Sequence, residues 1–183
     1  MNTLELIDYA RQIDSANAEL QALAAEYGEA GLCKPAAGGG WSAAECIDHV
    51  GVTLAAYLPG LRAAVAETRK GKRAEGPFSY GLLAKLMIWA IAPPVRLRTR
   101  APETFAPRPQ PDVKTAMETW FSHHSALQKL MEEADGWDLA AVKMASPANA
   151  KIKLPVGAVF AVLTAHARRH LLQAQRAVSG SGT

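Results

Sequence analysis

Two histidines, His166 and His170, stand four residues apart near the end of the chain. They lie within residues 154–178, where apolar residues recur at helical spacing. Steps of four and three from Val159 lead through Leu163 to both histidines, so they occupy the stripe of the predicted helix that faces a core. An i, i+4 pair of imidazoles on one helix face can bind a single metal ion. A pair of hydrogen-bonded core histidines is the alternative, and the spacing leaves both interpretations open.

A third histidine, His49, lies near the start of another predicted helix. Ser42 and Glu45 have the spacing of a capping box and follow Trp41, a candidate hydrophobic staple, so we expect this helix to begin at residue 42 and to end near residue 70. His49 lies one turn inside it, beside the predicted buried stripe. If the two helices align at that level, three imidazoles meet in the core. Three nitrogen ligands with an open fourth position are typical of a catalytic rather than a structural metal site.

Polar residues beside these histidines are further candidates. Gln173 is one turn past His170, where it could bond a ligand's second nitrogen, or serve as an ordinary polar residue at the bundle end. Glu45 could orient a ring or act as a base, but its capping role already explains it. Arg168 and Arg169 lie off the stripe, where we expect solvated side chains, although an anionic substrate could use one of them.

Four long helices are expected to position these residues. Apolar periodicity and start or stop signals place them at residues 3–28, 42–70, 112–134 and 154–178, with Gly28 as the stop of the first. Pro59 predicts a kink or a break in the second. His123 and His124 are adjacent on the third, so they point about 100° apart and are expected to have surface or packing roles.

The connections between these helices differ in length. Residues 71–111 form a long connection that includes a short apolar helix at about 80–92, and such a length allows the second and third long helices to run parallel. We expect residues 135–153 to form a loop. No run of β-branched and aromatic residues with period two is evident, so the sequence predicts no sheet.

Composition narrows the class of protein. The 183 residues fit one domain over 1–178 with a flexible tail at 179–183, and 49% apolar with 7% aromatic residues favours packed helices. The charge of +3 is small, and the arginines at 96, 98 and 100 have no interleaved aromatic residues, so we expect no nucleic-acid binding. No signal peptide or membrane span is evident, and Cys33 and Cys46 lack metal-type spacing. We expect a cytoplasmic protein without a membrane partner.

The motifs around the histidines resemble those of a known family. Trp41-Ser42-x-x-Glu45-x-x-x-His49 and His166-x-x-x-His170-x-x-Gln173, in this order and at this separation, are similar to the DinB-like (YfiT-like) metal-binding bundles. The resemblance spans nearly the whole chain. It implies an all-α, up-down-down-up four-helix bundle, frequently dimeric, with a divalent metal bound by three histidines.

The resemblance also implies candidate activities. The family's metal ligands match His49, His166 and His170, nickel or zinc is the usual ion, and some members are thiol-dependent S-transferases or isomerases. Many members carry an acid where this chain has Ala167. We therefore expect a metal-dependent enzyme, a thiol-dependent S-transferase or a hydrolase, that acts on a small molecule, uses a low-molecular-weight thiol as a candidate cofactor and forms a homodimer. The alternative is a non-catalytic, stress-related binding module with a structural or vestigial metal.

Overall fold

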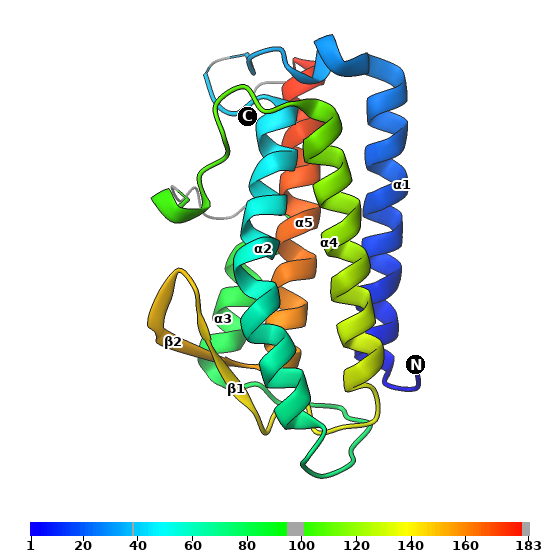
Figure 1. Cartoon of the computed structure of the whole chain (residues 1–183), viewed down its shortest axis with the longest axis vertical. Helices are drawn as coiled ribbons and strands as arrows, with labels where there is room; N and C mark the ends of the chain where they lie inside the picture. The colour runs from blue at the N-terminus through cyan, green and yellow to red at the C-terminus, as the bar shows by residue number, and fades with distance from the viewer. Residues whose placement is uncertain (38, 95–100, 181–183) are drawn as a thin grey trace.

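Four long helices lie side by side in the computed structural model, which describes residues 1–37, 39–94 and 101–180 (Figure 1). They are α1 (Leu4–Leu32), α2 (Ala43–Thr68), α4 (Val113–Ala134) and α5 (Val156–Ser179). In Figure 1 the chain ascends along α1 and α5 and descends along α2 and α4. The smaller elements are helix α3 (Gly81–Ile91), the 3-10 turn η1 (Glu103–Phe105) and strands β1 (Lys143–Ser146) and β2 (Asn149–Pro155). The prediction of a mostly helical fold is confirmed.

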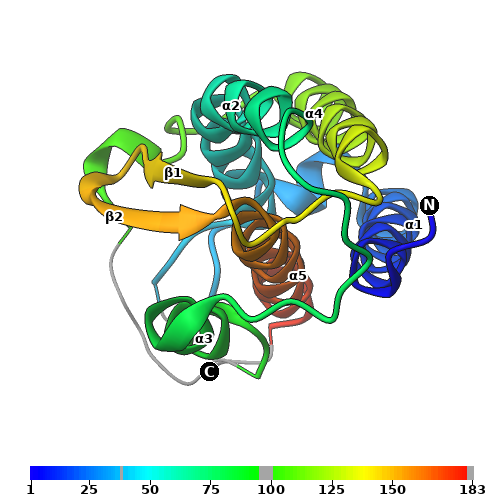
Figure 2. The same ribbon diagram turned by 90° about the horizontal axis from the view of Figure 1, so that it is seen from below.

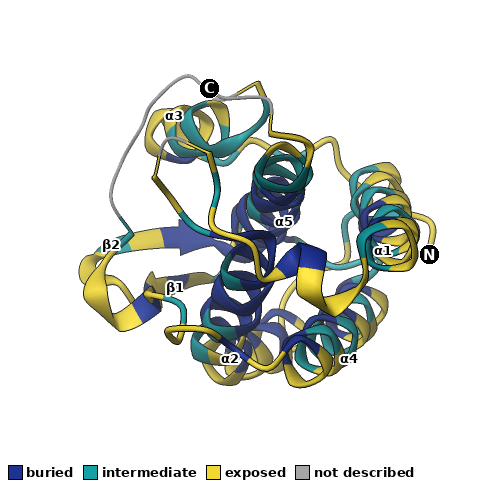
Figure 3. Ribbon diagram, turned by 90° about the horizontal axis from the view of Figure 1, so that it is seen from above, coloured by how far each residue is buried: buried dark blue, intermediate teal, exposed yellow. Residues whose placement is uncertain are grey.

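Helix α5 occupies the middle of the fold. Every residue from 156 to 165 is buried, because this segment is apolar on all sides and can be covered all round. Helices α1, α2 and α3 surround it when the molecule is viewed along the bundle (Figure 2), and Figure 3 shows most of α5 in the colour of buried residues. The core thus holds α5 rigidly, and with it any side chain that α5 directs toward a neighbouring helix.

Helix α2 begins at the predicted capping box. The Glu45 backbone N–H donates to the Ser42 hydroxyl at 3.2 Å, and the Ser42 N–H donates to the Glu45 carboxylate at 2.8 Å. Pro59 lies inside the helix without dividing it, so the break considered from the sequence does not occur. Because the cap fixes the first turn, the residues one turn further along are held at a defined level of the bundle.

The first helix is longer than predicted. Gly28 does interrupt the helical conformation where the sequence predicted its end, because its φ of 63° and ψ of 176° lie outside the helical region. A further helical turn follows and ends at Leu32, whose side chain is completely buried. Burial of Leu32 explains why the chain resumes a helix after the glycine.

A β-hairpin stands where the sequence predicted only a loop, and the expectation of no sheet is wrong. Strands β1 and β2 pair antiparallel, with Lys143 opposite Pro155 and Ser146 opposite Asn149. The hairpin is short and largely solvent-exposed, and it packs against α2 through its few buried residues. Its stability therefore depends on tertiary contacts that local sequence preference does not reveal.

The connection between α2 and α4 contains the predicted short helix as α3. Glu5 of α1 accepts hydrogen bonds from the Phe78 backbone N–H and from the Tyr80 hydroxyl, which fastens this connection to the bundle. The predicted arginine cluster at 96–100 and the end of the predicted tail, 181–183, lie outside the described residues, whereas Ser179 still belongs to α5. None of the described helices combines the length and the hydrophobicity that a membrane-spanning segment needs.

Candidate metal centre

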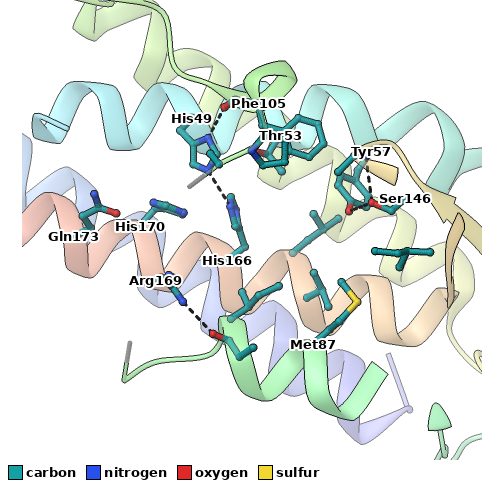
Figure 4. Close-up of a pocket in the computed structure, with 18 of the residues that line it drawn as sticks. His49, Thr53, Tyr57, Met87, Phe105, Ser146, His166, Arg169, His170 and Gln173 are labelled. Carbon is teal, nitrogen blue, oxygen red and sulfur yellow. Dashed lines mark hydrogen bonds between the residues drawn. The ribbon is translucent and has the colours of Figure 1, made fainter. Parts of the chain in front are cut away.

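Three histidines from two helices meet in the bundle. His166 and His170 project from successive turns of α5 toward α2, where His49 faces them (Figure 4). One ring nitrogen from each of the three lies within 4.8 Å of the other two. The alignment of helices that the sequence analysis required is therefore present, and the three predicted imidazoles are adjacent.

The ring orientation of His49 is fixed from outside the cluster. Its Nδ1 lies 2.5 Å from the backbone carbonyl oxygen of Phe105, an acceptor, so Nδ1 carries the proton. The lone pair is then on Nε2, which lies 3.1 Å from Nε2 of His166. A histidine that donates one N–H to a carbonyl and directs the other nitrogen into a cluster has the arrangement usual for a metal ligand.

Burial keeps all three imidazoles neutral. The pKa of His170 is lowered to about 3, mainly by burial and also by the neighbouring His49 and Arg169, while a hydrogen bond with Gln173 partly opposes the shift. The pKa of His166 is well below its ordinary value for the same reason, and burial also lowers the pKa of His49. Neutral imidazole is the form that donates a lone pair to a metal, so no proton competes at ordinary pH.

The residues present fit a divalent cation. The Nδ1 atom of His170 is buried and has no hydrogen-bond partner among the described residues. The Nε2 atoms of His49 and His166 lie 3.1 Å apart, so either a single proton is shared between them or both direct their lone pairs at one ion. A cation would satisfy several lone pairs at once, and three imidazole nitrogens suit zinc, nickel or copper better than magnesium or calcium.

An ion pair holds the segment that supplies the Phe105 carbonyl. Asp48 is buried, and its carboxylate accepts hydrogen bonds from the Arg108 backbone N–H at 2.8 Å and from Arg108 Nε at 3.0 Å, with a further bond from Nη2. Asp48 precedes His49 in α2, and Arg108 follows Phe105 by three residues. The pair therefore couples α2, which carries His49, to the segment that orients the His49 ring.

A cavity of about 500 Å³ opens beside the three histidines, all of which line it. Its walls come from α2, α3, α5, η1 and the hairpin, and most of them are apolar, including Met87, Ile91 and Leu163. Arg169 is the one charged side chain among the described residues that line it, and its guanidinium donates to the Ala90 carbonyl at 3.0 Å. The cavity has the size and character of a small-molecule site.

Of the other residues that the sequence offered as candidates for the site, some line the cavity and some lie away from it. Gln173 lines the cavity next to His170. Arg169 also lines it, whereas the sequence favoured solvated side chains for both arginines and gave a role at the site to one of them only as an alternative. Glu45 forms the cap. His123 and His124 lie outside the cluster, with Nδ1 atoms 3.1 Å from the Gly51 carbonyl oxygen and 3.2 Å from Asn17 Oδ1.

Several residues at the site were missed by the sequence analysis. Trp41 was predicted as a staple and as part of the family motif, but its contact with the histidines was not: its ring packs at a tilt against His49 and His170, with centroids 4.7 and 5.9 Å away. Thr53 and Tyr57 follow His49 at intervals of four along α2, which is a readable signal, and both line the cavity. Phe105 and the hairpin residue Ser146 come from segments whose position local sequence does not predict.

The fold and the cluster define a class, that of helical proteins with a three-histidine candidate metal centre between two helices. The family model described as the DinB superfamily matches residues 12–174, and the chain belongs to that superfamily. No curated protein and no solved structure matched the chain.

Proposed function

We propose that His49, His166 and His170 bind one divalent metal ion, zinc or nickel, and that the chain is a metal-dependent enzyme acting on a small molecule. The observation that carries this proposal is the cavity of about 500 Å³, which all three histidines line. A site with three protein nitrogens and adjoining space for a further ligand is suited to catalysis, whereas a structural site is closed by four protein ligands.

The chain and the ion would have separate roles. A bound divalent cation supplies Lewis acidity and lowers the pKa of a water or thiol. The Phe105 carbonyl holds the His49 ring in the ligating tautomer. The apolar walls from α3 and α5 exclude water from the substrate, and Arg169 provides a positive charge near the histidines. Among the described residues that line the cavity there is no carboxylate, lysine or cysteine, and we assign the attacking group to a water or a low-molecular-weight thiol.

The composition of the cavity lining favours one alternative function, that of a non-catalytic binding module. A cavity without a carboxylate has no obvious general base, and Ala167, where many relatives carry an acid by resemblance, is a buried apolar residue. Such a module would bind the metal and a small molecule without converting it. Thiol transfer and ester hydrolysis remain our preferred reactions.

Turnover assays on metal-loaded protein separate these functions. Zinc- and nickel-loaded protein would be incubated with glutathione, mycothiol or bacillithiol and chlorodinitrobenzene, and separately with nitrophenyl esters. We expect conjugate or nitrophenol to form at a rate that disappears in chelated protein and in His166→Ala. Metal bound at one equivalent without turnover of either kind would favour the binding module.

Three further proposals concern the whole molecule. We propose the up-down-down-up bundle, which the helix directions in Figure 1 support. We propose a homodimer, which the exposed apolar side chains of α3, such as Leu82 at 84% exposure, support. Sedimentation equilibrium would test the dimer. We also propose a cytoplasmic location, testable by fractionation of expressing cells.

A further inference from the structure

The end of the cavity formed by α2 and the hairpin is lined by residues that carry hydroxyl groups. Thr53 and Tyr57 follow His49 along one face of α2, and Ser146 of β1 lies across from Tyr57 (Figure 4). At 1.5 Å rise per residue, Thr53 is about 6 Å and Tyr57 about 12 Å from His49 along the helix axis. These groups are thus at a distance from the histidines that a small elongated molecule can span.

The Thr53 hydroxyl has no hydrogen-bond partner in the described part of the chain. The residue is only 4% exposed, and its Oγ1 makes no hydrogen bond with any described residue. In many helices such a hydroxyl bonds to the carbonyl four residues earlier, but here it does not. A buried hydroxyl without a partner is costly, and on a residue that lines a cavity a ligand atom can supply the missing hydrogen bond.

Tyr57 and Ser146 supply a second donor at the same end. Their hydroxyl oxygens lie 2.8 Å apart, and both residues are buried. Two hydroxyls that share one hydrogen bond use only one of their two protons, so one O–H remains to donate elsewhere. The Ala148 N–H donates to Ser146 Oγ at 3.3 Å, so this contact consumes acceptor capacity and leaves that proton available.

The polar groups at this end carry no formal charge. Arg169, the charged lining residue in the described part of the chain, belongs to α5 and neighbours His170. A carboxylate or phosphate at Thr53 would lose its hydration without gaining a cation, which is unfavourable. A neutral oxygen is the better match.

We propose that Thr53, Tyr57 and Ser146 form a neutral hydroxyl subsite that binds a hydroxyl or carbonyl oxygen of the ligand, while the ligand's apolar body lies against the cavity walls. The inference deepens the proposed function, because it defines the substrate class of the same cavity. The substrate is a mainly apolar molecule. The end of it that lies at the hydroxyl groups is uncharged and carries an oxygen, about 6–12 Å from His49 along the axis of α2. The hairpin therefore contributes to specificity as well as to the fold.

Two matched probes test the subsite without any metal. Phenylpropanol and phenylpropyl fluoride, each with a phenyl ring at the end of a three-carbon chain, differ by a hydroxyl against a fluorine of similar size. Their dissociation constants would be measured by NMR titration in chelator-treated protein, for wild type and for Thr53→Val, which removes the hydroxyl and keeps the shape.

We expect Thr53→Val to weaken phenylpropanol roughly two- to tenfold, the effect of one hydrogen bond, and to leave phenylpropyl fluoride unchanged. Thr164→Val is the matched control, because the Thr164 hydroxyl is likewise buried and unpartnered among the described residues but does not line the cavity. That variant should bind both probes as wild type does.

Equal losses for the two probes, no loss for either, or failure of phenylpropanol to bind the wild type would overturn the subsite. None of these results bears on metal binding at the histidines. Conversely, a chain that bound no metal but showed the expected probe selectivity would retain the subsite and lose the proposed metal-dependent function.

Discussion

Replacing Arg108 with alanine should weaken metal binding, although Arg108 is not itself a ligand. Among the described residues, the Arg108 backbone and guanidinium donate all the hydrogen bonds to the buried Asp48 carboxylate. Three residues earlier, the Phe105 carbonyl accepts the proton of His49 Nδ1. Loss of the guanidinium removes two of the three hydrogen bonds that Arg108 donates to Asp48, so the segment that orients His49 becomes freer to shift.

The size of the effect follows from these contacts. Partners that orient a ligating histidine typically contribute 10- to 100-fold in metal affinity. The Asp48 side chain is almost completely buried, whereas the Arg108 side chain is about half exposed. Removing the Arg108 guanidinium therefore also leaves a buried carboxylate that has lost most of its hydrogen bonds. We expect zinc affinity to fall about tenfold or more, together with a stability loss of about 1–3 kcal/mol.

Competition titration against a chromophoric zinc chelator would measure the affinity, and urea denaturation of the metal-free protein would measure stability separately. Arg69→Ala is the matched control, because Arg69 pairs with Glu133 on the surface at 3.7 Å and both side chains are well exposed. Such a pair contributes about 0–1 kcal/mol and lies away from the histidines. If Arg108→Ala bound zinc as tightly as the wild type, the coupling through Phe105 would be refuted.

Two further predictions concern stability. A Cβ added at Gly157 would lie 2.2 Å from the Tyr80 hydroxyl oxygen, so Gly157→Ala should lower the free energy of unfolding by about 1–3 kcal/mol. In a Tyr80→Ala background the same change should cost far less by urea denaturation, and an equal cost would contradict the proposed clash. Burial lowers the pKa of His124 from 6.5 to about 3, so the unfolded chain binds the extra proton first as pH falls below 6.5. Stability should then decrease by about 1.4 kcal/mol per pH unit from this residue until pH approaches 3. A plot of the free energy of unfolding against pH should be shallower for His124→Gln than for the wild type by that slope. Parallel plots for the two proteins would refute the lowered pKa of His124.

The helices and the histidine cluster were predictable because their signals are local and periodic. The capping box at Ser42 fixes where α2 begins, and the i, i+4 spacing fixes which face of α5 carries both histidines. Alignment of the two helices was the one long-range assumption, and the structure places His49 opposite His166. Metal binding itself stays a prediction.

The cavity could not be derived in the same way. Its walls combine α3, η1 and the hairpin, which meet only in the tertiary structure. Residues 151–154 do alternate between lysine and apolar side chains, a weak strand signal that the sequence analysis passed over. The sequence favoured a solvated Arg169 because it lies outside the apolar stripe that carries His166 and His170. In the structure, α2 and α3 together cover a wider part of the α5 surface than that stripe.

The most direct test of the central claim is the metal content of purified protein, measured by elemental mass spectrometry with chelators absent from all buffers. Wild type and His166→Ala would be compared as isolated and after incubation with zinc or nickel followed by desalting. The proposed centre predicts about one equivalent per chain in the wild type and little or none in the variant. No retained metal in either protein, with both folded by circular dichroism, would mean that His49, His166 and His170 are core histidines and that the proposed metal-dependent function is wrong.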